Sequence, residues 1–163
     1  MLSDNLFKEK SFLEHKSIVQ GISVLQILTG IGGFAALYDA FQNETIAYLA
    51  LIIFVPIFVL DIVGGALLFR NKILGFRISL AMQVIHSVKF SILGLSFGAS
   101  IPIYLYIILK FWGFGFDTGF GTSDITFFTG ANEAFISLNI ITVVLAIILF
   151  KIQKKQTTTT NFN

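Results

Sequence analysis

The chain has 163 residues, of which 55% are hydrophobic and only 12% are charged, and its formal net charge is +2. A soluble domain carries about twice that charged fraction, so the composition indicates an integral membrane protein. The small net charge excludes the massed Lys and Arg of a nucleic-acid-binding surface. The absence of cysteine excludes disulfides, thiolate metal sites and cysteine nucleophiles.

The N-terminal segment, residues 1–16, mixes apolar side chains with charged ones. This mixture predicts a short helix that lies on the inner surface of the membrane, with its apolar residues in the interface. A frayed tail is the alternative.

Four apolar runs follow, and together they predict a membrane domain over residues 17–151. A helix needs roughly 20 mostly apolar residues to cross the hydrocarbon core. We therefore expect an all-α fold, a four-helix transmembrane bundle, with spans that cover residues 17–38, 46–69, 73–97 and 131–150.

A fifth apolar stretch, residues 101–116, competes with these as a span, but it alternates with period two instead of 3.6. Such alternation is typical of a strand. Asp117, Thr118 and Gly119 form a plausible turn, after which the chain returns as a second strand. The sequence predicts an outer β-hairpin over residues 101–128, between the third and fourth helices.

Basic residues in the short connections set the orientation, because cytoplasmic loops carry the excess of Lys and Arg. With four spans, every basic cluster falls on the side of the two termini. We expect both termini in the cytoplasm and a disordered cytoplasmic tail over residues 152–163. The clusters contain Lys8, Lys10, Lys16, Arg70, Lys72, Lys151, Lys154 and Lys155.

Five polar residues inside the predicted spans are candidate site residues, because ionisable groups are costly in lipid. Asp61 lies in the second span, and Arg77, Gln83, His86 and Lys89 lie in the third. Asp61 is within reach of Arg77, Gln83 or His86. A carboxylate beside an imidazole would suit a proton-linked transporter. A structural hydrogen bond between two helices is the alternative.

A polar stripe on the third span and small residues on the first and second spans predict helix contacts. The stripe faces the bundle either as a cavity lining or as the contact that joins the helices. The stripe contains Ser79, Gln83, His86, Ser87 and Gly94, and the matching side of the first span contains Ser23, Gln26, Gly30 and Gly33.

Aromatic residues at even positions of the hairpin are candidate partner- or lipid-binding residues. The alternative is an aromatic belt that seats the loop at the membrane surface. These residues are Tyr104, Tyr106, Trp112, Phe114 and Phe116.

No motif for catalysis, phosphate binding or metal ligation is present, so we expect no enzyme, no cofactor and no metal site. Two functions remain open. The first is a non-catalytic accessory or scaffold subunit of a larger membrane assembly. The second is a small ion- or proton-coupled transporter or channel centred on Asp61, Gln83 and His86. The expected partners are the lipid bilayer and a membrane protein or a second copy, in the inner membrane of a bacterium.

Overall fold

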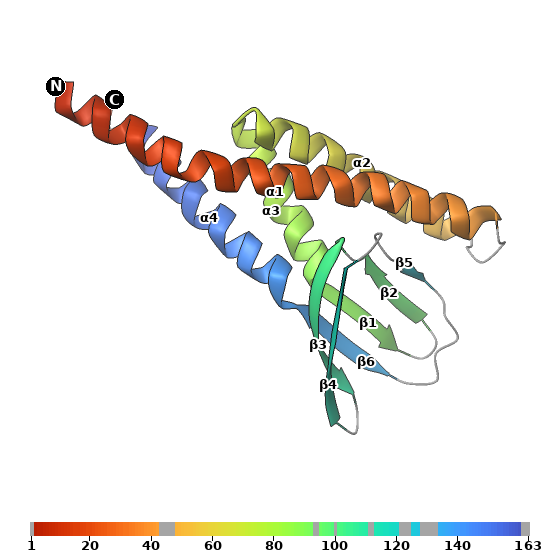
Figure 1. Ribbon diagram of the computed structural model, residues 1–163. Helices are drawn as coiled ribbons and strands as arrows, with labels where there is room; N and C mark the ends of the chain where they lie inside the picture. The colour runs from red at the N-terminus through yellow and green to blue at the C-terminus, as the bar shows by residue number, and fades with distance from the viewer. Residues whose placement is uncertain are drawn as a thin grey trace.

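The structure is a computed structural model that describes the backbone of residues 2–42, 48–92, 95–99, 101–110, 113–120, 125–127 and 134–160. It describes the side chains of residues 15–42, 48, 51–91, 101–110, 113–119 and 134–154. The helices are α1 (Leu2–Gln42), α2 (Tyr48–Phe69), α3 (Ile73–Ser87) and α4 (Ile140–Thr160). Figure 1 shows α1 and α2 side by side, while α3 and α4 lead away from them to a sheet.

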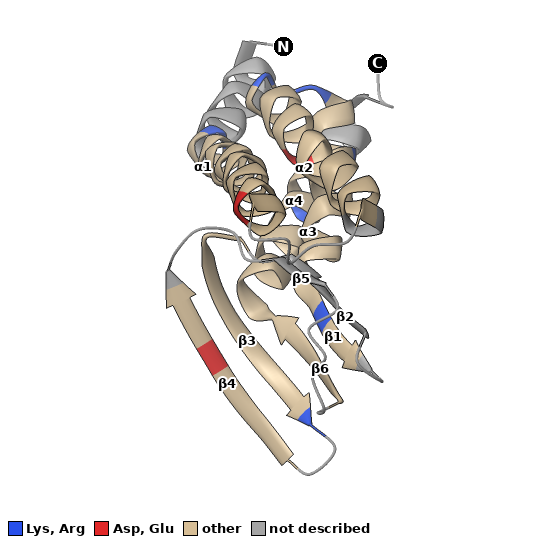
Figure 2. Ribbon diagram, turned by 90° about the vertical axis from the view of Figure 1, so that its right-hand side faces the viewer, with Lys and Arg blue, Asp and Glu red and all other residues tan. Residues whose placement is uncertain are grey.

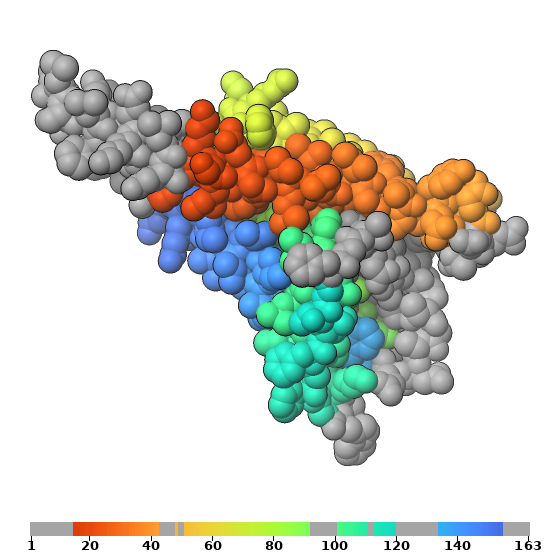
Figure 3. Space-filling model, viewed as in Figure 1, coloured from red at the N-terminus to blue at the C-terminus, as the bar shows by residue number. Residues whose placement is uncertain are grey.

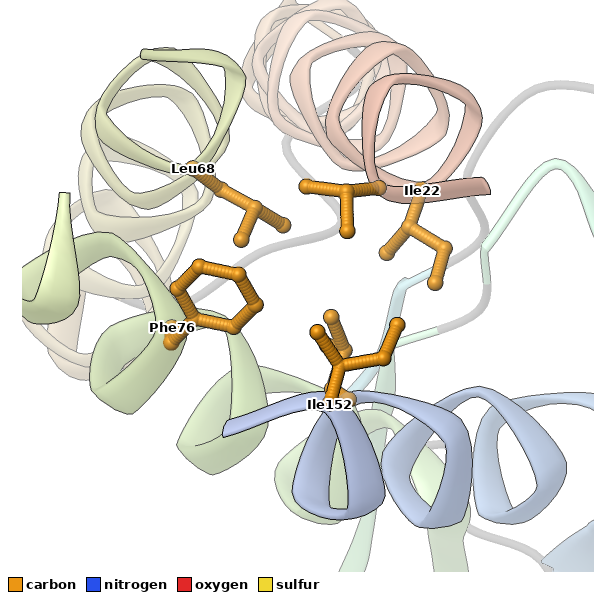
Figure 4. Packing of buried hydrophobic residues seen from close by; sticks show 6 residues of the cluster. Ile22, Leu68, Phe76 and Ile152 are labelled. Atoms are coloured by element: carbon orange, nitrogen blue, oxygen red, sulfur yellow. The ribbon is translucent and has the colours of Figure 1, made fainter. Parts of the chain in front are cut away.

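One hydrophobic cluster joins all four helices near the end where the two termini lie. Ile22 of α1, Leu68 of α2, Phe76 of α3 and Ile152 of α4 point toward one another (Figure 4). Their burial ranges from 0% to 6% exposed. This cluster therefore sets the position of the helices relative to one another.

A tight turn makes α2 and α3 antiparallel neighbours. Asn71 adopts a positive φ of 55°, which Asn tolerates better than most residues. The amide of Asn71 donates to the carbonyl of Leu68 at 2.8 Å, and the amide of Lys72 donates to that of Leu67 at 3.0 Å. Asp61 and the second half of α3 thereby lie side by side.

The strands between α3 and α4 form one antiparallel sheet in the order β4-β3-β6-β1-β2-β5. They are β1 (Val88–Ile92), β2 (Leu95–Ala99), β3 (Ile103–Lys110), β4 (Gly113–Phe120), β5 (Ile125–Phe127) and β6 (Phe135–Asn139). Strand β1 continues directly from α3, and β6 leads directly into α4. Since β1 pairs with β6 in the middle of the sheet, the sheet extends the α3–α4 pair.

The helical part of the sequence prediction is confirmed in its main features. The second predicted span, residues 46–69, is α2, and the first, residues 17–38, lies within α1. In the described part of the chain, His15–Gln42 and Leu51–Phe69 are long and apolar enough to cross a membrane. The helix Ile73–Ser87 is apolar but shorter.

The third and fourth predicted helices extend too far into the sheet. Helix α3 ends at Ser87, and the rest of the predicted span 73–97 contributes to β1 and β2. Residues 135–139 of the predicted span 131–150 form β6. Pairing between β1 and β6, such as Lys89 with Ser137, decides both ends. The fold therefore contains a six-stranded sheet and is not all-α.

Both ends of the chain are more helical than the sequence predicts. The N-terminal segment 1–16 is not separated from the first span, because α1 runs without a break from Leu2 to Gln42. The tail predicted to be disordered from residue 152 continues α4 as far as Thr160.

The predicted hairpin is present, but its turn is in a different place. Strands β3 and β4 pair from Ile103 with Phe120 to Lys110 with Gly113. The predicted turn at residues 117–119 lies inside β4, and the connection falls at residues 111–112, outside the described residues. Gly119 lies beneath the ring of Tyr104 across the strand pair, where a Cβ atom would meet that ring. The hairpin register thus takes precedence over the local turn signal.

Candidate functional site

A carboxylate and an imidazole meet in the interior of the helix bundle. Nε2 of His86, on the last turn of α3, lies 2.8 Å from Oδ2 of Asp61 on α2. The side chains are 1% and 0% exposed, respectively. The sequence offered three partners for Asp61, and the structure brings it to His86. Buried charged groups need such a partner, because the loss of hydration is otherwise uncompensated.

Helix α1 approaches the same place closely enough to add a third polar side chain. A Cβ atom on Gly30 would lie 2.8 Å from the carbonyl oxygen of Phe58 and 3.2 Å from Cβ of Asp61. A Cβ atom on Gly64 would lie 3.0 Å from Nε2 of Gln26. The two glycines let α1 and α2 pack almost backbone to backbone. Gln26 therefore lies beside Asp61 between the helices.

Several polar atoms around the pair are buried and have no hydrogen-bond partner among the described residues. They are Oδ1 of Asp61, both side-chain polar atoms of Gln26, Oε1 of Gln83 and Oγ of Ser79. Nearby hydroxyls differ, since Ser23 and Thr29 donate to carbonyls of their own helix at 2.7 and 2.9 Å. Leaving a buried polar group unsatisfied costs about 1–3 kcal/mol. Such a concentration of unsatisfied atoms is typical of a site that binds water, a proton or a small ion.

The polar interior continues from the helices into the sheet. Register pairing of Val88 with Leu138 places the α3–β1 junction beside the β6–α4 junction. Asn139 at the latter junction is fully buried, and its Oδ1 accepts from the amides of Leu105 and Ile141 at 3.3 and 3.1 Å. One sheet face therefore carries buried polar groups directly beyond His86.

This face also holds Lys89. Its Nζ lies 5.2 Å from the centre of the Tyr106 ring, a cation–π geometry. Tyr106, Ser91 and Ser137 on the same face are 1%, 0% and 3% exposed. Glu133, the acid that Lys89 was expected to approach, lies outside the described residues.

The other predicted site residues fall in different places. Arg77 is exposed and does not join the Asp61 site. Gln83, Ser79, His86 and Ser87 are buried, as the predicted polar stripe requires. Gly94, which was expected to extend that stripe, lies beyond α3 and outside the described residues.

The predicted aromatic surface of the hairpin is divided between the two faces of the sheet. Tyr106 pairs with Asp117, so it shares a face with odd-numbered residues of β4 and not with Phe114 and Phe116. Prediction of a single face was wrong because two residues connect the strands and so reverse the parity. Trp112 belongs to that connection, outside the described residues.

Sequence reasoning treated Gln26 only as a packing residue and did not identify Ser91 and Ser137 at all. The signal was present, because Val88 to Ser91 and Phe135 to Asn139 alternate apolar and polar residues. Read as strands, these segments put their serines on one face.

The arrangement can bind and release a proton. An imidazole and a carboxylate at hydrogen-bond distance exchange a proton readily, and amide groups beside them orient water or a cation. In the part of the chain that the structure describes, no group of three or more His, Asp or Glu gathers to hold a metal ion.

Comparisons of the chain with protein-family models, with curated proteins and with solved structures found no match.

Proposed function

We propose that the chain crosses the membrane four times, with both termini in the cytoplasm, and that it transports protons or a small cation through the Asp61–His86 site. The observation that supports transport is the buried pair, surrounded by polar atoms that lack partners. Ionisable residues at membrane depth mark ion pathways and proton relays more often than other features.

The orientation is supported by the position of the basic residues. Figure 2 shows both termini at the end of the helices away from the sheet. Arg70, Lys72, Lys151 and Lys154 are exposed and belong to the helix ends and the α2–α3 turn there. In contrast, the two lysines of the strands are Lys89 and Lys110. The bias of basic residues to one end fits cytoplasmic termini.

The path is supported by the continuity of polar groups. Buried polar side chains run from Gln26 and Asp61 in the bundle, past His86, to Asn139 at the sheet. Such a row lies roughly along the direction in which α3 continues into β1. A transported proton or ion would follow it between the two sides.

The test uses the full chain purified into liposomes that contain a pH-sensitive dye, with separate assays for sodium and potassium uptake. We expect the wild type to move protons or one of these cations, and Asp61→Asn to abolish that flux. Arg77→Gln is the matched control, because Arg77 is a charged residue of α3 that is exposed. Absence of flux in the wild type, or equal flux in Asp61→Asn, would overturn the proposal.

A second function, an accessory subunit of a membrane assembly, is favoured by one specific observation. Strand β4 is an edge of the described sheet, and its eight residues offer one side of their backbone for pairing. Exposed strand edges are covered in native proteins, and open sheet edges do not occur in lipid. A strand or helix of another protein would then cover β4.

The second function is tested by placing a photo-reactive residue at Thr118, which is exposed on β4, in native membranes. We expect one crosslinked product of defined mass, identified by mass spectrometry. The control position is Lys154, exposed on α4 at the opposite end. Recovery of the uncrosslinked chain alone, after extraction in a gentle detergent, would count against an accessory subunit.

A further inference from the structure

One face of the sheet is apolar across its described strands. The register places Phe114, Leu109, Ile136 and Phe90 in one row, and Phe116, Ile107, Leu138 and Val88 in the next. The polar residues of the same strands lie on the opposite face. Among the described side chains of these two rows, none is charged or polar.

The burial of the two faces is the reverse of that in a soluble sheet. Phe114, Phe116, Leu109 and Ile136 are 73%, 66%, 59% and 52% exposed, whereas Tyr106 on the polar face is 1% exposed. A soluble antiparallel sheet packs its apolar face on the core and turns the polar face to water. Apolar-out and polar-in alternation is typical of sheets that face lipid. Figure 3 shows β3 and β4 at the surface of the molecule, below α1.

The lengths of α3 and α4 leave part of a membrane uncrossed. Fifteen residues of α3 span about 22 Å at a rise of about 1.5 Å per residue. The apolar part of α4, from Ile140 to Phe150, spans about 16 Å by the same rise. The hydrocarbon core is about 30 Å thick. Each helix therefore ends roughly 8 to 14 Å before the outer boundary.

Strands supply the missing distance. Three to four strand residues span about 10 to 13 Å at about 3.3 Å per residue, which corresponds to β1 from Val88 and β6 back from Leu138. Lys110, exposed at the far end of β3, pairs with Phe135 at the end of β6. A lysine at this level reaches the outer boundary with its charged end.

The apolar surface of the sheet is also continuous with that of the helices. Val84 on the last turns of α3 is 57% exposed, and Val144 and Ile147 on α4 are 47% and 49% exposed. Val88 and Leu138 follow them on the strands and are 37% and 40% exposed. No change of surface chemistry marks the point where the helix becomes a strand.

We infer that the apolar face of the sheet contacts the acyl chains of the bilayer, so that α3 with β1, and β6 with α4, each cross the membrane as a helix followed by a strand. This inference rests on the proposed membrane topology and extends it. Lipid accounts for the exposed apolar face, the short helices and the level of Lys110 together.

The test measures contact with acyl chains by the fluorescence of single tryptophans. The natural Trp112 is replaced by phenylalanine, and the full chain is placed in liposomes whose acyl chains carry bromine, a short-range quencher. We expect Phe116→Trp to be quenched several-fold more strongly than Asp117→Trp, its neighbour on the polar face. Val59→Trp on α2, where Val59 is 44% exposed, reports on the membrane insertion of the helices.

The outcomes separate the inference from the topology on which it rests. Strong quenching at positions 116 and 59, with weak quenching at 117, supports the inference. Quenching at 59 but not at 116 overturns it and leaves the helical spans in place. In that case, a disulfide between copies formed by Phe116→Cys would identify the face as an interface between two chains. Absence of quenching at 59 overturns the membrane topology itself.

Discussion

His86 of α3 and Asp61 of α2 lie 2.8 Å apart at Nε2 and Oδ2, inside a bundle that leaves neither more than 1% exposed. They are the one printed ion-pair contact of the described chain, and they join helices that are already held together by an apolar cluster. The pair is thus not needed to attract α2 to α3. Its position instead determines which polar groups share the interior.

The strength of this pair is measurable by a double-mutant cycle. We expect Asp61→Ala and His86→Ala each to lower the free energy of unfolding, because each leaves the other group buried without its partner. The double variant should be less destabilised than the sum, with a coupling energy of about 1–2 kcal/mol, the range for polar pairs between membrane helices. Unfolding in detergent, followed by circular dichroism, gives the four values.

The control for the cycle pairs Asp61→Ala with Arg77→Ala. Arg77 is exposed on α3 and does not contact Asp61, so their effects should add within about 0.5 kcal/mol. Additive effects of Asp61→Ala and His86→Ala as well would contradict an energetic link between the two side chains.

The close approach of α1 to α2 predicts a strong effect of a single methyl group. In Gly30→Ala, the new Cβ would lie 2.8 Å from the Phe58 carbonyl oxygen and 2.6 Å from a side-chain carbon of Ile62. The helices must separate, and overpacking of this kind typically costs about 1–3 kcal/mol. The melting temperature in detergent should fall, and any flux through the Asp61 site should fall with it.

Gly21→Ala is the matched control for this prediction. Gly21 lies on the same helix, and a Cβ atom there would meet nothing within 4 Å. Because alanine has the higher helix propensity by about 1 kcal/mol, we expect this variant to be as stable as the wild type or more so. Equal destabilisation by both substitutions would show that the effect is not one of helix contact.

The sequence was a good guide to the helices and to the site, for physical reasons that particular residues illustrate. Asp61 and His86 are expensive in an apolar run unless they meet, so their spacing from the Arg70–Lys72 turn was enough to suggest contact. Gly30 and Gly33 indicated a close helix contact because small residues at helical spacing have few other uses in an apolar helix.

The end of α3 was not predictable from hydropathy alone. Residues 88–97 are as apolar as a helix in a membrane, and a short apolar run fits a strand equally well. What decides is the pairing of Phe90 with Ile136, 46 positions along the chain, which no local property of either segment shows. The same long-range pairing moved the hairpin turn away from Asp117–Gly119.

Asn139 is expected to stabilise the junction between β6 and α4. Its Oδ1 accepts from the amide of Ile141 at 3.1 Å, as a helix N-cap does, and from that of Leu105 on β3 at 3.3 Å. Asn139→Ala should lower the free energy of unfolding by about 1–2 kcal/mol, the usual effect of removing a cap. Asn139→Ser keeps an acceptor for the cap and should recover part of that loss. If Asn139→Ala is as stable as the wild type, the two contacts are not stabilising.

The orientation of the chain can be tested by chemical labelling from each side of the membrane. The sequence contains no cysteine, so a single introduced thiol is the only one present. Lys110→Cys lies at the far end of β3 and Lys154→Cys lies near the end of α4, and both positions are exposed. With an impermeant maleimide added to intact cells, we expect Lys110→Cys to react and Lys154→Cys to react only after the membrane is opened. Labelling of both from the same side would contradict four crossings, since α3 with β1 and β6 with α4 would then not separate the sheet from the C-terminal end.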